Sequence, residues 1–482
     1  MKGLKERVIQ GFLWRAGVGG GQQILQVLFT ILLARLLTTA DFGLVMMALL
    51  VTRLAQALSG VQFGASLVRD ADATEGQVSA IFVCHVGINV AMSAACCLAA
   101  PLAATFFGEP RLEPIVAVLA WSLLLSSLSF PTVILRKRME FGAYSALEIA
   151  SMIVANVVAV ATAFAGLGVW SLVVRLMVDR AVFAVGVWCI SGWRPSRPDF
   201  RGIAHHVRMG LHLLGSNVLY YVSQNLTQIL VGKFAGKDLL GCFGVAFTLA
   251  VAPAVQVQAV LTTVLQPAFA FFQNDPPAFR RKAYASMLAL GLVYIPAMLG
   301  LAAIARPLIL FAYGPRWEAA SLFLVPLAGV GLVKGLEHLL RCVIIASGRS
   351  AAILRITAVE TGASVVLLAI GGGLGGANGL ALAYLASALV AGVLTLRAAD
   401  AAVGGGGVFV RAISRSLAAA AVMAAVTGAA AAVMPWPHGA TLLIQVTLGI
   451  TLYFILRFRA LTREERSVVR GLPVAGAVLA RR

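Results

Sequence analysis

The stretch Val325–Gly348, VPLAGVGLVKGLEHLLRCVIIASG, is long and apolar enough to cross a lipid bilayer. It nevertheless carries Lys334, Glu337, His338 and Arg341, which follow one another at i, i+3, i+4 and i+7. On a helix this spacing places all four side chains on one face. Because a single charge at mid-bilayer costs at least about 2.5–3.5 kcal/mol, this face is predicted to meet a water-filled cavity rather than lipid. The alternative interpretation is a set of internal ion pairs that hold helices together.

The composition is typical of a polytopic membrane protein. Of the 482 residues, 60% are hydrophobic and 12% are charged, and the mean hydropathy is +0.93. The formal net charge of +19 comes from basic residues scattered between apolar runs, so nucleic acid is not expected as a partner. The six cysteines lie inside apolar runs without metal-ligand spacing, and no P-loop or GxSxG sequence is present. We therefore expect no metal, no cofactor and no catalytic residue.

Apolar runs predict an all-α polytopic membrane protein with about 14 transmembrane helices. They fall at 11–34, 42–65, 78–106, 114–135, 145–167, 169–191, 211–232, 240–266, 285–311, 320–346, 352–372, 377–396, 414–434 and 439–457. Lysine and arginine concentrate in alternate connections, which predicts that both termini face the cytoplasm. By this assignment the opposite side receives only Arg35, Arg111, Lys233, Lys237, Arg306 and Arg316.

The first twelve predicted helices form two related halves in the sequence. Residues 31–48 align without gaps on residues 229–246, a shift of 198 positions, and PRLE (110–113) is echoed by PRWE (315–318). Because six is an even number, the halves share one orientation and are expected to enclose a central cavity. The predicted domains are an N-terminal six-helix lobe at 1–198, a C-terminal six-helix lobe at 199–400, and a linker with two extra helices and a cytoplasmic tail at 401–482.

Polar stripes on the first helix of each half are predicted to line that cavity. On the first helix Arg15, Gln22 and Gln26 share a face, and on the seventh helix four polar residues keep one face polar for three turns. For any single amide, an interhelical hydrogen bond is the alternative. The predicted substrate-binding residues are Arg15, Gln22, Gln26, Arg53, Asn217, Tyr221, Gln224, Gln228, Lys334 and Arg341. Glu337 and His338 are the predicted coupling residues, because histidine titrates near neutral pH.

Other polar groups receive simpler interpretations. Arg175 and Asp179, at i and i+4, are interpreted as an internal salt bridge, and Glu148 and Glu360 as lone carboxylates at the lipid interface. The run Gly404–Gly407 is interpreted as a flexible linker. Cations outnumber carboxylates among the predicted cavity residues, which favours an anionic cargo such as a phosphate.

Several segments carry a resemblance to a known family. They are ILLARLLTTADFGLVMMALL (31–50), VQFGASLVR (61–69), LRKRMEFG (135–142), NLTQILVGKFAG (225–236), VLQPAFAFFQND (264–275) and FAYGPRW (311–317). With them the chain resembles Wzx-type polysaccharide flippases, in the polysaccharide-transport branch of the multidrug/oligosaccharidyl-lipid/polysaccharide exporter superfamily, and most of all the exporters of colanic acid type.

The resemblance implies two six-helix lobes in a V around a central cavity, with two further helices. It implies a transporter, not an enzyme, in the bacterial cytoplasmic (inner) membrane. The implied cargo is a polyprenyl-pyrophosphate-linked oligosaccharide, moved from the cytoplasmic to the periplasmic leaflet by alternating access for exopolysaccharide or lipopolysaccharide biosynthesis. Membrane lipid and other polysaccharide assembly proteins are the further partners implied.

Two alternatives stay open at this point. A drug/cation antiporter of the same superfamily is expected to concentrate buried carboxylates, whereas the predicted cavity residues are mainly cationic. A membrane glycosyltransferase or polymerase is expected to need a long periplasmic loop with an acidic base. The connections in this chain are too short for such a loop.

Overall fold

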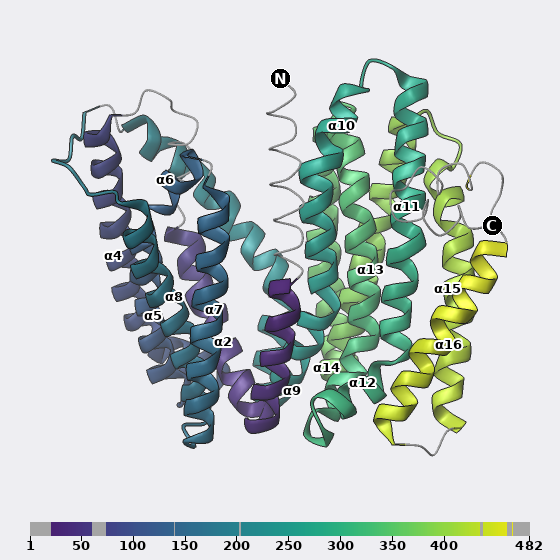
Figure 1. Cartoon of the computed structure of the whole chain (residues 1–482), viewed down its shortest axis with the longest axis horizontal. Coiled ribbons are helices and arrows are strands. Elements are labelled where there is room, and N and C mark those ends of the chain that lie inside the picture. The colour runs from purple at the N-terminus through teal and green to yellow at the C-terminus, as the bar shows by residue number, and fades with distance from the viewer. Residues whose placement is uncertain are drawn as a thin grey trace. The chain divides into compact units, whose positions relative to one another are not determined.

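All regular elements in the described part of the chain are helices (Figure 1). The computed structural model describes residues 21–59, 74–138, 140–201, 204–433, 437–459 and 465. Within these ranges nine helices are long and apolar enough to cross a membrane, and Gly21–Leu36 and Leu112–Leu128 are shorter apolar helices. The predicted all-α, multi-pass membrane fold is confirmed, and the number of 14 spans stays a prediction.

The chain divides into two compact units, Met1–Gly244 and Val245–Arg482. In the first unit α4 packs along α5 and α7 packs along α8, while α2 contacts α4, α5 and α8. Its helices, besides Gly21–Leu36, are α2 (Thr39–Ser59), α4 (Glu75–Phe107), α5 (Leu112–Leu128), α6 (Thr132–Lys137), α7 (Phe141–Phe164), α8 (Val169–Ser191) and the larger part of α9 (Ala204–Val260).

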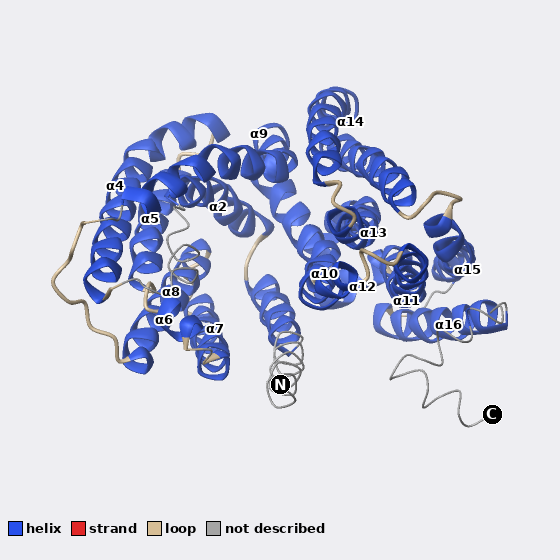
Figure 2. Ribbon diagram, turned by 90° about the horizontal axis from the view of Figure 1, so that it is seen from above, coloured by secondary structure: helices blue, strands red, loops and turns tan. Residues whose placement is uncertain are grey.

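The second unit is organised around α13, which packs between α11 and α14 (Figure 2). Of the candidate spans, the one containing α13 has the largest buried share, 61%. The elements after α9 are η1 (Leu261–Leu265), α10 (Gln266–Phe271), α11 (Pro276–Ala303), α12 (Ala305–Ala312), η2 (Pro315–Trp317), α13 (Glu318–Ala346), α14 (Ser350–Ala402), α15 (Val408–Val433) and α16 (His438–Arg459). The apolar run that carries Lys334, Glu337, His338 and Arg341 therefore lies at the centre of its unit.

The two longest helices are each interrupted by one glycine. In α9 the backbone of Gly236 has φ +80°, and in α14 that of Gly376 has φ +54°. Backbone conformations with positive φ are costly for residues with a Cβ atom. Each element thus consists of two helical segments that meet without a loop, which explains why two apolar runs fall within each.

The four-glycine run before α15 is a hydrogen-bonded turn rather than a flexible linker. The glycines have φ values of +91°, +73°, +85° and +65°. The carboxylate of Asp400 accepts hydrogen bonds from the backbone N–H groups of Gly407 at 2.9 Å and Val408 at 2.7 Å. Arg280 donates to the carbonyl oxygen of Gly405 at 3.1 Å. Composition alone indicated flexibility, but the side chain of Asp400 fixes the turn and caps α15.

Candidate functional site

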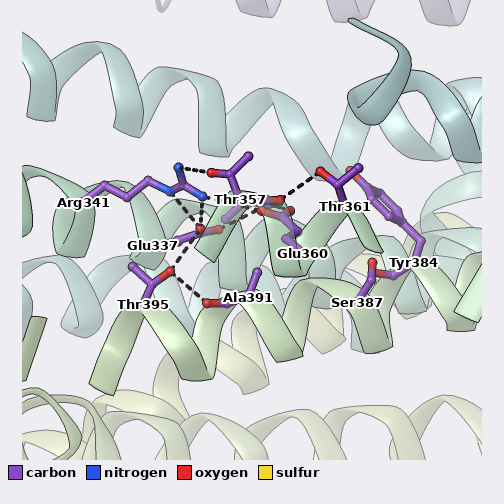
Figure 3. A network of polar contacts seen from close by, with 10 residues as sticks. Glu337, Arg341, Thr357, Glu360, Thr361, Tyr384, Ser387, Ala391 and Thr395 are labelled. Carbon is purple, nitrogen blue, oxygen red and sulfur yellow. Dashed lines mark hydrogen bonds and ion pairs between the residues drawn. The ribbon is translucent and has the colours of Figure 1, made fainter. Parts of the chain in front are cut away.

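The polar stripe on α13 is an ion-pair network in this structure (Figure 3). The guanidinium of Arg341 lies 2.8 Å (Nε) and 2.6 Å (Nη2) from Oε1 of Glu337. On the other side, Nζ of Lys334 lies 3.3 Å from Oε2 of the same carboxylate. Glu337 is only 2% exposed. The predicted i, i+3, i+4 and i+7 spacing therefore brings both cations onto one buried carboxylate.

A second carboxylate, Glu360 of α14, completes the network. It is ion-paired with Lys334, and its Oε2 lies 3.5 Å from Nη2 of Arg341. The interpretation of Glu360 as a lone carboxylate at the lipid interface is wrong, because α13 and α14 pack together and place it against the stripe. Two cations and two carboxylates balance, so the network is neutral. A buried carboxylate with several such partners avoids the large penalty of an isolated buried charge.

Two threonines bind the same network from α14. Thr395 Oγ1 donates to Glu337 Oε1 at 3.3 Å, and Thr357 Oγ1 accepts from Nη1 of Arg341 at 3.4 Å. His338 lies beside Glu337, is half-buried and forms no hydrogen bond with another described residue. Of the four stripe residues, His338 is thus the one whose polar atoms remain available.

A polar pocket of about 340 Å³ lies within the first unit, between the helix Gly21–Leu36, α7 and α8. We call it the α7–α8 pocket. Its polar lining includes Gln22, Gln26, Glu148, Asn156, Arg175 and Asp179. The lining residues recur every three or four positions along α7 and α8, so each helix presents one face to the pocket.

The charged groups of the α7–α8 pocket are only partly satisfied within the protein. Glu148 accepts a hydrogen bond from the hydroxyl of Tyr144 at 3.0 Å. Nε of Arg175 and Oδ1 of Asn156 are buried without a hydrogen-bond partner. No ion pair links Arg175 to Asp179 among the described residues. The predicted salt bridge is therefore wrong. Glu148 lines this pocket instead of standing alone, because α7 turns its polar face towards α8.

The remaining predicted site residues are distributed as follows. Arg15 lies outside the described residues, as does the side chain of Asn217. Arg53 is exposed on α2, and the hydroxyl of Tyr221 donates to the carbonyl oxygen of Leu50 at 2.8 Å, one turn before Arg53. Gln224 is exposed and Gln228 is 8% exposed. The structure thus brings together Gln22 with Gln26, and Lys334 with Arg341.

A reciprocal glycine contact joins α2 to the part of α9 that follows Gly236. A Cβ atom built on Gly43 would lie 1.8 Å from the carbonyl oxygen of Lys237, and one on Gly241 would lie 2.1 Å from that of Thr39. The 198-residue shift converts Gly43 into Gly241 and Thr39 into Lys237. The contact therefore maps onto itself, as a two-fold related interface does.

Ion pairs and hydrogen bonds surround this helix crossing. Nζ of Lys237 lies 2.8 Å from a carboxylate oxygen of Glu109. The hydroxyl of Thr39 donates to Oδ1 of Asp238 at 2.6 Å. Lys233 donates to the carbonyl oxygen of Phe106. We name this set, with Gly43 and Gly241, the glycine crossing. No cluster of three or more His, Cys, Asp or Glu side chains able to hold a metal ion occurs in the described part of the chain.

Comparisons with known proteins give both a family and a fold. The family model described as "Polysaccharide biosynthesis protein" matches residues 32–322. The chain is 23% identical to the lipopolysaccharide biosynthesis protein WzxC of Escherichia coli K12, over 81% of this chain and 80% of the relative. It is 26% identical to the teichuronic acid biosynthesis protein TuaB of Bacillus subtilis 168, over 73% of each chain. The solved lipid II flippase MurJ, in an inward closed conformation, aligns with a TM-score of 0.74 at 14% identity, over 92% of this chain and 98% of that one.

Proposed function

The chain belongs to the polysaccharide biosynthesis protein family, and on this basis we propose that it flips a lipid-linked oligosaccharide across the bacterial inner membrane. The match of the family model to residues 32–322 carries the proposal. WzxC and TuaB, whose names assign them to lipopolysaccharide and teichuronic acid biosynthesis, support it. Membership of this family favours a glycan cargo over a drug/cation antiport or a glycosyltransferase reaction.

The physical problem defines what the protein has to supply. A sugar-pyrophosphate headgroup cannot cross a hydrocarbon core about 30 Å thick unaided. The proposed cargo is a polyprenyl-pyrophosphate-linked oligosaccharide, moved from the cytoplasmic to the periplasmic leaflet by alternating access of two lobes, 1–198 and 199–400. No covalent bond is made or broken in this process. Both termini are proposed to face the cytoplasm, and other polysaccharide assembly proteins are proposed as partners.

Cations for the pyrophosphate are proposed to come from Arg15, Arg53, Lys334 and Arg341. Lys334 and Arg341 are held by Glu337 and Glu360 in this conformation. A cargo phosphate would therefore have to exchange with those carboxylates. Arg53 is exposed and forms no ion pair with a described residue, whereas Lys334 and Arg341 are half-buried and ion-paired. Its planar guanidinium suits bidentate contact with phosphate.

The function is tested in vesicles that contain purified protein and a preformed lipid-linked oligosaccharide. We expect the fraction of glycan accessible to a membrane-impermeant oxidant to rise in protein-containing vesicles, while the mass of the lipid-linked oligosaccharide stays unchanged. Protein-free vesicles are the control. A glycan that is lengthened or cleaved, or a leaflet distribution equal to that of the control, would contradict the proposal.

The cation assignment is tested separately by export in cells. Alanine variants of the four proposed cations should lower polysaccharide export with little loss of membrane-inserted protein, and Arg53→Lys should restore only part, because lysine lacks the planar fork. Arg306→Ala, which removes an exposed cation from α12, is the matched control. Normal export by all four alanine variants would refute the assignment.

A further inference from the structure

We propose that the α7–α8 pocket binds one neutral pyranose sugar of the transported glycan. The inference rests on the proposed function for its biological ligand. Its structural basis is a polar cavity within the first unit alone, formed by the helix Gly21–Leu36, α7 and α8. The sequence had suggested two cavity-lining amides, Gln22 and Gln26, together with a lone carboxylate and a salt bridge here.

The charges of the pocket select a neutral ligand. Glu148 and Asp179 line it together with Arg175 and Arg180, two carboxylates against two guanidinium groups. Because the charges balance, a ligand with one sign of charge is attracted by one pair of side chains and repelled by the other, and gains little net attraction. A hydroxyl group suits both kinds of lining, because it donates to a carboxylate and accepts from a guanidinium. The pocket therefore fits a ligand that carries several hydroxyl groups and no net charge.

Two buried polar atoms of lining residues lack a hydrogen-bond partner within the described part of the protein. Asn156 is only 1% exposed and lines the pocket, and its Oδ1 has no hydrogen-bond partner. Its Nδ2 is used within α7, donating to the carbonyl oxygen of Met152 at 2.7 Å. Nε of Arg175 is likewise buried and without a partner. An unmet donor and an unmet acceptor are costly, and two hydroxyl groups of one sugar would satisfy both once the side chains of Asn156 and Arg175 turn towards the cavity.

Size and apolar lining agree with a single sugar ring. The volume of about 340 Å³ lies at the lower end of the range of about 300–1,000 Å³ usual for small-molecule sites. Tyr144 and Phe183 also line the pocket, with ring centroids 5.8 Å apart and planes at 87°. An aromatic edge and face together offer apolar contact to the C–H face of a pyranose, while the amides of Gln22 and Gln26 contribute further donors and acceptors.

Direct binding tests the proposal without any transport measurement. The full-length protein in lipid nanodiscs is examined by saturation-transfer NMR with methyl glucoside, methyl galactoside and N-acetylglucosamine. We expect at least one of them to bind. Binding should weaken about tenfold in Asp179→Asn and in Glu148→Gln, because each change replaces a charge-assisted hydrogen bond by a neutral one. Val157→Ala, on the exposed opposite face of α7, is the matched control and should bind like the parent. Inorganic pyrophosphate should not compete.

Three results would overturn the proposal: no sugar of the panel binds the parent, both pocket variants bind as the parent does, or pyrophosphate displaces the sugar. The vesicle assay separates this failure from failure of the proposed function. If the parent moves the lipid-linked oligosaccharide and the pocket variants move it equally well, the flippase stands and the sugar site fails. If the parent binds sugar but moves no lipid-linked oligosaccharide, the site stands and the flippase fails.

Discussion

Glu337 holds two cations at once, and its energetic role follows from its burial. It is 2% exposed and lies 2.6 Å from Arg341 and 3.3 Å from Lys334. In the same unit Arg306 and Glu318 form an ion pair at a comparable 2.9 Å, but their side chains are 72% and 53% exposed. The N–O distances of the two ion pairs are similar, but their exposure to solvent differs. Comparing them therefore separates the effect of burial on stability from the effect of the contact itself.

We expect Glu337→Ala to destabilise the protein by about 3–5 kcal/mol, because the change leaves two partly buried cations, 17% and 25% exposed, to share Glu360. Glu318→Ala should cost only about 0–1 kcal/mol, as exposed ion pairs do. Thermal unfolding of both purified variants in one detergent, compared with the parent, measures the difference. Equal shifts of the melting temperature would show that the network on α13 and α14 contributes no more than a surface pair.

Glu337 and His338 are proposed to couple an ion or proton gradient to lobe movement. This role is distinct from holding α13 and α14 together. His338 lies next to Glu337 without a hydrogen-bond partner among the described residues, so no contact within the described protein occupies its ring nitrogens. Glu337→Gln and His338→Asn should therefore weaken the response of flipping to an imposed pH gradient across vesicles. Variants that unfold at lower temperature yet respond to the gradient as the parent does would leave bracing as the only role of the network.

At the scale of elements, the glycine crossing gives a structural reason for the alignment of residues 31–48 with residues 229–246. Gly43 and Gly241 match under the 198-residue shift. In the structure each glycine lets a carbonyl oxygen of the other helix approach to a distance that no Cβ atom tolerates. The repeat thus preserves a contact that is two-fold related, formed by α2 and by the second segment of α9.

Gly43→Ala and Gly241→Ala should each destabilise the protein by about 1–3 kcal/mol or more, since the atoms in the way are backbone and cannot rotate aside. Gly87→Ala in α4 is the matched control. A Cβ atom there meets nothing within 4 Å, and alanine should add about 0.5–1 kcal/mol of helix stability. Thermal unfolding decides between them. If Gly43→Ala melts at the parent's temperature, α2 and α9 do not approach as closely as described.

Individual elements mark where sequence reasoning succeeded and where it stopped. Apolar length and the i, i+3, i+4, i+7 spacing predicted the α13 span and the common face of its polar residues, because both depend on one helix alone. A water-filled cavity on that face stays a prediction, and the structure shows the alternative, a set of internal ion pairs. Glu360 was missed because its partners lie on another helix, and no spacing within α14 reveals them. The α7–α8 pocket had a usable signal, since Tyr144, Glu148 and Asn156 are spaced four and eight residues apart along α7 and so share one face. Their joint meaning appears only when α8 packs against them.

The turn at Gly404–Gly407 shows a related limit. A glycine run has the composition of a flexible linker, and the fixing group, Asp400, lies only four residues before it. Local sequence does not reveal whether such a carboxylate caps the next helix or stays in solvent. The packing of α15 along α11 is the further information needed, because it positions the N-terminus of α15.

At the scale of the whole molecule, membrane orientation is the prediction that frames the others, since the direction of transport is meaningless without it. Charge asymmetry places Arg111 and Arg316, which belong to the PRLE and PRWE echoes, on the periplasmic side, and Arg281 on the cytoplasmic side. All three side chains are exposed, so a cysteine at each position is not hindered by packing.

In a variant without the six native cysteines, Arg111→Cys and Arg316→Cys should react with a membrane-impermeant maleimide added to cells whose outer membrane is permeabilised. Arg281→Cys should react only after the inner membrane is broken. The cysteine-free parent is the labelling control, and export by it shows that removing the six thiols leaves the fold intact. Whether Arg111→Cys and Arg316→Cys label from the same side also tests the repeat, because parallel halves require equivalent loops on one side of the membrane. Labelling of one without the other would reject parallel halves even if the termini face the cytoplasm.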